Sequence, residues 1–336
     1  MIKKLCITID NVFKIFFFST FNGGFAIPNR RKWKLINSMN EILEVTFMKF
    51  ILMKNWLLIL ISSLLIVSCQ KENNPSPAIV AAKTDLNISY GTDASQKMDI
   101  YLPPGRTAAA TKVIILIHGG GWSSGDKADF AQYVDTLKKR LPAYAIININ
   151  YRLATGTSNL FPTQENDVKT AIEFIYSKRT EYAISDKFVL LGTSAGGHLS
   201  LLHAYKYSTP VKIKAVVDFF GPTDLVDMYN NPASILASPA ALAAVVGATP
   251  TTNLTLYQQS SPINFVVATS PPTLILQGGV DVVVSPSQSA TLATKLQTFG
   301  VVHQYVVYPT ENHGWSGANL IDSFNKIDAF LAAHVN

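Results

Sequence analysis

Cysteine is almost missing from this chain of 336 residues, which contains only Cys6 and Cys69. No cysteine follows residue 69, so a disulfide framework cannot stabilise the larger part of the chain. Stability there must come from an apolar core, and a hydrophobic content of 48% in a chain of this length is enough to build one. The same composition excludes disorder over most of the sequence.

Charged residues are also few, at 15%, and the positive excess is confined to the front of the chain. The formal net charge is +6, and residues 1–54, with nine Lys or Arg against three Asp or Glu, account for all of it. The remaining residues contain 19 basic and 19 acidic side chains. Balanced charge gives no electrostatic reason to expect a DNA or RNA partner.

The apolar block at residues 56–67 is shorter than the roughly 20 residues that a membrane-spanning helix needs. It follows Lys54 and precedes small residues, a pattern typical of a secretion signal. The end of the block, Ile66-Val-Ser-Cys69, resembles the lipobox of bacterial lipoproteins, in which the cysteine is diacylated and becomes the mature N-terminus. We therefore expect an exported protein that is anchored to a membrane through Cys69, on the periplasmic or the outer-surface face. The alternative is a secretory peptide cut elsewhere, which leaves no anchor.

Signal peptides normally begin a chain. The residues that precede this signal-like segment are therefore expected to lie outside the fold. Met48 or Met53 is then the true start. The region from residue 85 shows no internal repeat and no second core, which favours one domain. The predicted organisation is an upstream extension at 1–52, a lipoprotein-type signal peptide at 53–69, a polar tether at 70–84 and a globular domain at 85–336.

The globular region alternates short β-branched runs with amphipathic stretches, the pattern of an α/β protein. Continuous apolar runs such as 113–117 indicate strands buried on both faces. The looser stretch 223–264 predicts helical excursions over the sheet edge, at most a small lid. Strands are expected at 86–90 and 97–102, which form an antiparallel hairpin, and at 113–117, 143–150, 187–191, 214–220, 272–277 and 301–308. Helices are expected at 126–141, 167–176, after residue 194, and at 285–299 and 319–334.

Ser194 lies in Gly192-Thr-Ser-Ala-Gly196, between a buried strand and a helical pattern. Glycines on both sides of a serine permit a tight strand-to-helix turn that presents the hydroxyl outward. A serine hydroxyl is a weak nucleophile, so it needs a histidine to accept its proton and an acid to hold that histidine in the right tautomer. The turn therefore predicts a nucleophile at Ser194 if such partners exist elsewhere in the chain.

His313 is the histidine expected to act with Ser194, because it lies in a loop just after the last predicted strand. The other histidines fall within strands, helices or the terminus, or precede glycines, as His118 does, and are expected to be structural. Asp281, just after the preceding strand, is the predicted acid, since it stands between the serine and the histidine in chain order. Asp218 and Asp224 remain the alternatives.

Donors for a developing oxyanion are expected in His118-Gly-Gly-Gly-Trp122, directly after a buried strand. Glycine lets backbone N–H groups approach a ligand closely, and the predicted hole consists of the N–H groups of Gly120, Gly121 and Ala195. Trp122 and Trp315 flank the predicted site and are candidates to stack on an aromatic or sugar ring of the substrate.

Together these motifs resemble the α/β-hydrolase fold, specifically the HGGG-bearing esterase and lipase group related to hormone-sensitive lipase. The motifs are Asp99-Ile-Tyr-Leu-Pro-Pro, His118-Gly-Gly-Gly-Trp122 with Gly125-Asp-Lys127, Asn150-Tyr-Arg-Leu and Gly192-Thr-Ser-Ala-Gly-Gly-His198. The resemblance implies a mostly parallel sheet with helices on both faces, and hydrolysis of carboxylic esters through an acyl-enzyme without metal or organic cofactor. It is greatest for secreted members acting on acetyl or feruloyl groups of plant polysaccharides.

Three functions stay open at this point. The short, Ala/Thr-rich excursion favours an esterase for short acyl groups over a long-chain lipase. An arylformamidase or peptidase would use the same three residues, because they also cleave amides. A binding lipoprotein that kept the fold and lost the activity belongs to a different class.

Overall fold

The computed structural model describes residues 80–235 and 237–336, together with seven isolated positions between residues 38 and 53. The chain divides between Ser76 and Pro77 into two units, and the described fold belongs to the second. Almost all of the predicted upstream extension and signal peptide, Cys69 included, and much of the tether lie outside the described residues. Within the described ranges, no helix is both long and apolar enough to cross a membrane.

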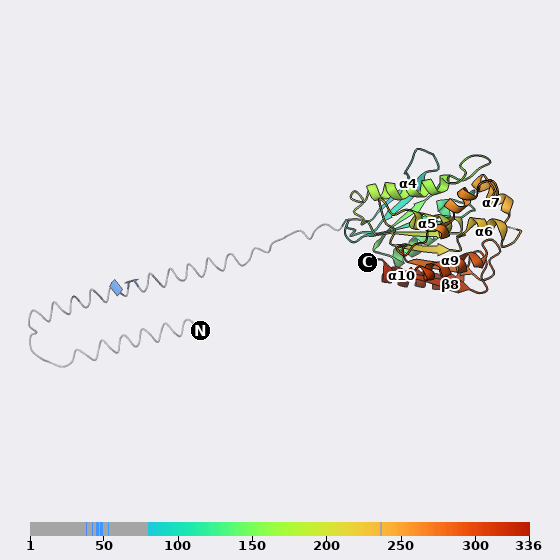
Figure 1. Cartoon of the computed structure of the whole chain (residues 1–336). Helices are drawn as coiled ribbons and strands as arrows, with labels where there is room; N and C mark the ends of the chain where they lie inside the picture. The colour runs from blue at the N-terminus through green and yellow to red at the C-terminus, as the bar shows by residue number, and fades with distance from the viewer. Residues whose placement is uncertain are drawn as a thin grey trace, which may run out of the picture. The chain divides into compact units, whose positions relative to one another are not determined.

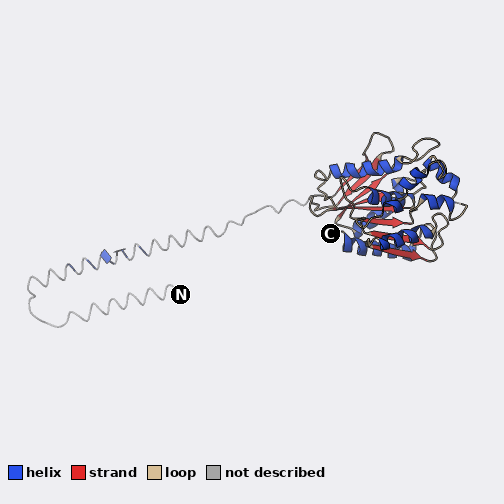
Figure 2. Cartoon of the chain, viewed as in Figure 1, coloured by secondary structure: helices blue, strands red, loops and turns tan. Residues whose placement is uncertain are grey.

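An eight-stranded sheet forms the centre of the domain (Figures 1 and 2). Its strands are β1 (Lys83–Ser89), β2 (Lys97–Leu102), β3 (Lys112–Ile117), β4 (Tyr144–Ile149), β5 (Phe188–Thr193), β6 (Ala215–Phe219), β7 (Thr273–Gly278) and β8 (His303–Tyr308). The order across the sheet is β1-β2-β4-β3-β5-β6-β7-β8. As predicted, β1 and β2 form an antiparallel hairpin. β2 is also antiparallel to β4, and all other neighbours are parallel.

Parallel pairing decides where the candidate residues meet. β5, β6, β7 and β8 run in the same direction, so their carboxyl ends lie along one edge of the sheet. Ser194 follows β5, Asp281 follows β7 and His313 follows β8. Residues separated by more than a hundred positions in the chain are therefore brought to the same edge, where α/β proteins build their sites.

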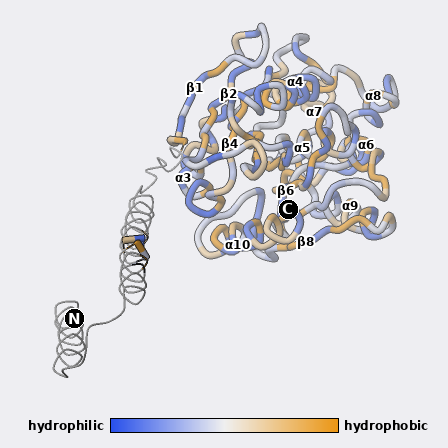
Figure 3. Tube along the Cα trace, turned by 90° about the vertical axis from the view of Figure 1, so that its left-hand side faces the viewer, coloured by the Kyte–Doolittle hydropathy of each residue, from blue (hydrophilic) through white to orange (hydrophobic). Residues whose placement is uncertain are grey.

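Helices cover both faces of the sheet. α3 (Ala131–Arg140) and α10 (Gly317–His334) pack on one face, with Leu137, Phe324 and Ile327 in a shared apolar cluster. α4 (Thr163–Ser177), α5 (Ala195–Lys206) and α9 (Pro286–Thr298) belong to the cluster on the other face. Figure 3 shows hydrophobic and hydrophilic positions alternating along α10, as an amphipathic helix against a sheet requires.

The stretch 126–141, predicted as one helix, begins with a tighter turn. η1 (Lys127–Phe130) is a 3₁₀ helix, and the α-helical part α3 starts only at Ala131. The carboxylates of Asp126 and Asp129 form a reciprocal capping box at this start, each accepting a backbone N–H from the other end of the turn. The cap at Asp126 agrees with the predicted start of the helix, whereas the apolar spacing does not reveal that its first turn is a 3₁₀ helix.

The excursion between β6 and β7 is helical, as expected, but it is packed rather than loose. It contains α6 (Leu225–Asn230), α7 (Pro239–Val246), α8 (Leu254–Gln259) and the 3₁₀ helix η2 (Pro262–Phe265). Leu225 and Tyr257 are fully buried in the same cluster as α5. These residues attach the segment to the core, although others, such as Ile235, are exposed.

Candidate active site

Ser194 occupies a tight turn between β5 and α5, with a φ of 52° and a ψ of −122°. This conformation is strained for a residue with a side chain, and a hydrogen bond from the Ser194 N–H to the Phe219 carbonyl, 2.8 Å long, helps to hold it. A Cβ on Gly192 would lie 2.2 Å from the Gly196 backbone, and one on Gly196 would lie 1.9 Å from the Ile117 carbonyl oxygen. Both positions must therefore be glycine because neighbouring backbone approaches too closely for any side chain.

The three residues predicted to act together are joined by hydrogen bonds. The Nε2 atom of His313 lies 2.9 Å from the Ser194 Oγ, and its Nδ1 atom lies 2.8 Å from Asp281 Oδ2. The Asp281 side chain is fully buried, whereas that of His313 is 19% exposed. The arrangement gives a hydroxyl, an imidazole and a carboxylate in the order that nucleophilic catalysis by serine requires.

The surroundings of Asp281 keep its carboxylate in one orientation. Its Oδ1 accepts the backbone N–H groups of Val283 and Val284 at 2.8 and 2.9 Å. Its Oδ2 accepts from the Gln277 side chain at 3.1 Å as well as from His313. A carboxylate that only accepts requires His313 to carry its proton on Nδ1, which leaves Nε2 free to take the proton of Ser194.

The other acids near this edge have different partners. Asp224 caps α6 by accepting the N–H groups of its first turn. Asp218 is fully buried below α5, where it accepts the Gly221 N–H at 3.0 Å, and burial raises the pKa of its carboxyl well above the usual range. Glu311 accepts from the Asn319 side chain. None of the three bonds to His313, so the geometry favours Asp281 over the alternatives left open by the sequence.

The glycine loop after β3 runs beside Ser194. A Cβ on Gly119 would lie 3.3 Å from the Ser194 Cβ, and Gly120 and Gly121 both have positive φ, at 100° and 55°. Ala195 is the first residue of α5, so its N–H has no acceptor within the helix. Among the described residues, the N–H groups of Gly120, Gly121 and Ala195 have no protein acceptor. They remain the predicted oxyanion donors.

Buried polar contacts hold the segment that directly follows the glycine loop. The Lys127 ammonium lies 2.7 Å from an Asp99 carboxylate oxygen on β2, and both side chains are largely buried. The Asn150 side chain accepts the Lys127 backbone N–H and donates to Asp126 at 2.7 Å. Three sequence motifs that stand far apart in the chain thus meet at one place. Their shared role is to hold the segment that follows the glycine loop.

His118 shapes the start of the loop, as predicted. Its ring stacks on Tyr151, with centroids 4.2 Å apart and an interplanar angle of 11°. The Tyr151 hydroxyl donates towards the carbonyl oxygens of His118 and Gly119 at 3.0 and 3.1 Å. Burial lowers the pKa of His118, which keeps the ring neutral in this position.

Comparison with known proteins agrees with this geometry. The profile of the family described as BD-FAE matches residues 98–296, more than half of the chain. The chain belongs to the BD-FAE family. A solved structure described as a truncated form of a carbohydrate esterase from gut microbiota superposes with a TM-score of 0.65 at 27% identity, covering 76% of this chain and 96% of that one. The predicted resemblance to α/β-hydrolase esterases is confirmed.

Curated relatives of this BD-FAE chain include ester and amide hydrolases. The probable carboxylic ester hydrolase LipM of Mycobacterium tuberculosis is 29% identical over 74% of this chain. The kynurenine formamidase avaC of Aspergillus versicolor is 33% identical over 35% of this chain. The aligned parts cover 61% and 46% of these relatives, so the chain matches less than two thirds of either one.

The two tryptophans considered for substrate stacking have different surroundings. Trp122 is only 4% exposed, packs edge-on against Phe161, and donates its indole N–H to His198 Nδ1 at 3.2 Å. Its ring faces are therefore covered by the core of the BD-FAE domain, and stacking on a substrate is ruled out for it. Trp315 is half-buried and lines a cavity next to the site.

His198 has a supporting role that its sequence context does not reveal. The ring is fully buried and joins three segments, since Nδ1 accepts the Trp122 indole N–H and Nε2 donates to the Ser260 carbonyl at 2.7 Å. It therefore connects helix α5, which follows Ser194, with the glycine loop and with the excursion. In the sequence, only the position of His198, four residues after Ser194 in the same predicted helix, pointed to a role. That position did not predict the hydrogen bonds to Trp122 and Ser260.

The buried histidines make the domain sensitive to acid. Burial lowers the pKa of His198 from 6.5 to about 4 and that of His203 to about 3. At a pH below the histidine pKa of the unfolded chain, the unfolded chain binds protons that the folded chain does not bind. The folded state is therefore favoured at neutral pH, and this advantage is lost as the pH falls. We expect the free energy of unfolding to fall by about 2 kcal/mol for each histidine between pH 7 and pH 5.

Urea unfolding of the purified domain across this pH range measures the loss. His203→Leu should remove about 2 kcal/mol of this fall, because the leucine titrates in neither state. An unchanged slope in this variant would show that other groups cause the acid sensitivity.

Proposed function

We propose that the chain is a serine hydrolase that cleaves carboxylic esters through an acyl-enzyme on Ser194. The observation that supports it is the unbroken series of hydrogen bonds from Ser194 through His313 to Asp281 at the carboxyl edge of the sheet. The second support is the family, whose relatives include a carboxylic ester hydrolase.

The geometry supports a two-step reaction. In the first step, Ser194 Oγ attacks the ester carbonyl while its proton passes to His313 Nε2, and the oxyanion accepts hydrogen bonds from Gly120, Gly121 and Ala195. His313 then gives that proton to the departing alcohol, which leaves the acyl group on Ser194. In the second step, water attacks the acyl-enzyme, its proton passes through His313 to Ser194, and the acid is released. Buried Asp281 stabilises the imidazolium in both steps.

For the substrate, we propose esters of short acyl groups, including acetyl or feruloyl groups carried by a polysaccharide. The packed excursion supports the short acyl group, because its bulky residues Leu225, Leu242 and Tyr257 are buried in the core and cannot cover a long acyl chain. The polysaccharide link rests on the resemblance to the solved carbohydrate esterase from gut microbiota. A panel of acetylated xylan, feruloylated oligosaccharide and simple esters measures the preference directly.

Amide cleavage on the same residues is the second candidate, favoured by the similarity to a formamidase. The deciding experiment compares the rates with a nitrophenyl acetate, an aryl formamide and a dipeptide anilide.

A fluorophosphonate probe should also add its mass to the peptide that contains Ser194, which separates an enzyme from a non-catalytic binding protein. A folded sample without this label would contradict both catalytic functions.

We also propose that the protein is exported and held on a membrane by lipid on Cys69. Residues 53–69 support this through the charged start, the short apolar block and the sequence Ile66-Val-Ser-Cys69. In a bacterial expression host, Cys69→Ala should shift the protein from the membrane fraction to the soluble fraction and abolish labelling by radioactive palmitate. Replacing Ser68 by alanine, which leaves a small residue before the cysteine, is the matched control. Equal labelling of the Cys69→Ala protein would contradict the anchor.

A further inference from the structure

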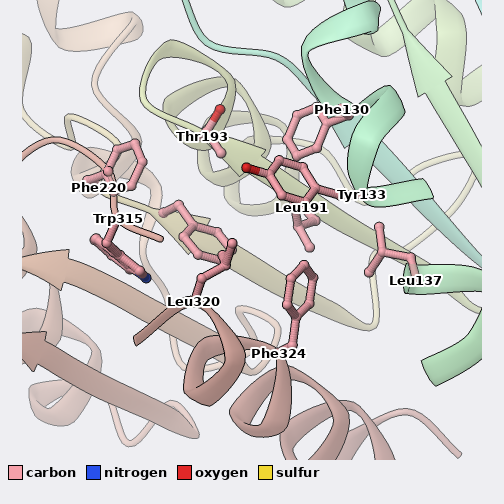
Figure 4. Close-up of a pocket in the computed structure, with 11 residues that line it drawn as sticks. Phe130, Tyr133, Leu137, Leu191, Thr193, Phe220, Trp315, Leu320 and Phe324 are labelled. Carbon is pink, nitrogen blue, oxygen red and sulfur yellow. The ribbon is translucent and has the colours of Figure 1, made fainter. Parts of the chain in front are cut away.

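A cavity of about 140 Å³ lies between α3, α10 and the strand that carries the nucleophile turn (Figure 4). Phe130 and Tyr133 line it from the side of η1 and α3, and Leu320 and Phe324 line it from α10. In Figure 4 these side chains face one another across the space above Leu191 of β5. The walls come from segments almost two hundred residues apart.

The walls of this cavity are almost entirely apolar. Of the lining side chains, only those of Tyr133, Thr193 and Trp315 carry a nitrogen or oxygen atom. The Trp315 indole N–H is already donated to Ser323 Oγ at 2.9 Å. A dry apolar space of roughly this size accepts a benzene-sized group, because a cavity of about 150 Å³ lined by Leu, Ile and Phe binds benzene.

The cavity touches residues next to both reacting groups. Thr193 directly precedes Ser194, and Gly314 and Trp315 directly follow His313. Phe220, which also lines the cavity, packs against the His313 ring with the centroids 4.6 Å apart. Ser194 and His313 themselves do not line the cavity, so an apolar group in this space would contact the residues that flank them.

We propose that this cavity is a specificity pocket that holds one apolar group of the substrate, of about benzene size. The assignment rests on the proposed ester hydrolysis and adds which part of the ester the domain selects. Burying such a group beside the scissile bond removes apolar surface from water in the transition state, which raises kcat/KM for esters that carry it. Esters without such a group leave the pocket empty and depend on the reacting residues alone.

The experiment compares two isomeric esters with ethyl acetate. Benzyl acetate carries the phenyl group on the alcohol side, and methyl phenylacetate carries it on the acyl side, so the preferred isomer identifies which part of the ester enters the pocket. The unchanged protein should prefer one of them to ethyl acetate by about tenfold or more in kcat/KM. Leu320→Trp fills the cavity and should abolish this preference while turnover of ethyl acetate stays within about twofold.

Ile321→Trp is the matched control, because Ile321 is the next residue on the same helix and is 56% exposed. Leu137→Trp, which fills the cavity from α3, tests the same point if Leu320→Trp fails to fold. Equal loss of activity on all three esters, or an unchanged preference in both filled variants, would show that the cavity is only a packing void. If the unchanged protein hydrolyses ethyl acetate but prefers neither isomer, the pocket assignment alone is wrong. Absence of any ester turnover would overturn the proposed function itself.

Discussion

Replacing Ser194 by alanine should lower the rate of nitrophenyl acetate hydrolysis by about 10⁴- to 10⁶-fold. In the proposed mechanism the hydroxyl forms the acyl-enzyme and gives its proton to His313 Nε2, which lies 2.9 Å away. Stability should change little, because the substitution removes one half-exposed oxygen and leaves the Ser194 N–H bond to Phe219 in place. Steady-state kinetics measure the loss, and thermal melting of the same sample measures the fold.

Ser200→Ala is the matched control for this variant. Ser200 lies on the same helix and is fully buried, and its hydroxyl donates to the Gly196 carbonyl at 2.8 Å. The substitution removes a hydroxyl from the same helix but changes none of the three candidate catalytic residues. Activity should therefore stay within about threefold of the unchanged protein. Retained hydrolysis by the Ser194→Ala protein would mean that another residue is the nucleophile.

Asp281→Asn should lower kcat by about 10⁴-fold and leave the fold intact, because it changes the tautomer of His313. The Val283 and Val284 N–H groups hold one side-chain oxygen of residue 281 in place. An asparagine would keep its oxygen there and turn its NH₂ group towards His313 Nδ1. The ring would then accept at Nδ1 and carry its proton on Nε2, where it cannot take the proton of Ser194.

The comparison with Asp224→Asn isolates this effect. Asp224 is the other aspartate considered after β6, and it accepts two backbone N–H groups at the start of α6. Asparagine is an equally good cap at such a position, so both activity and stability should be nearly unchanged. Similar kcat values for the Asp281→Asn and Asp224→Asn proteins would remove Asp281 from the mechanism.

Much of the fold could be predicted because its signals are local. The apolar runs at 113–117 and 143–150 correspond to β3 and β4, which are buried on both faces. The hairpin of β1 and β2 follows from two alternating segments close together in the chain. The type of helix was less predictable, because the first turn of the stretch predicted as one helix at 126–141 is the 3₁₀ helix η1.

Which residues of the candidate site lie together could also be predicted from the sequence. The positions of Ser194, Asp281 and His313 after successive strands implied a common edge, and the structure places the three within hydrogen-bonding distance. Their catalytic roles, like those of the oxyanion donors, stay predictions. Trp122 shows the limit of the approach, because its place beside the glycine loop suggested contact with substrate, whereas its ring lies in the core against His198.

The α/β class, the serine turn and the order of Ser194, Asp281 and His313 could all be recognised before the fold was known. Glycine spacing and apolar periodicity act on neighbouring residues, so they can be recognised without knowing the rest of the fold. Three-dimensional packing was needed to show which carboxylate reaches His313, what surrounds Trp122, and that α3 and α10 leave an apolar cavity over the end of β5. These features depend on how side chains from distant segments fill or fail to fill a shared space, and local periodicity carries no information about that packing.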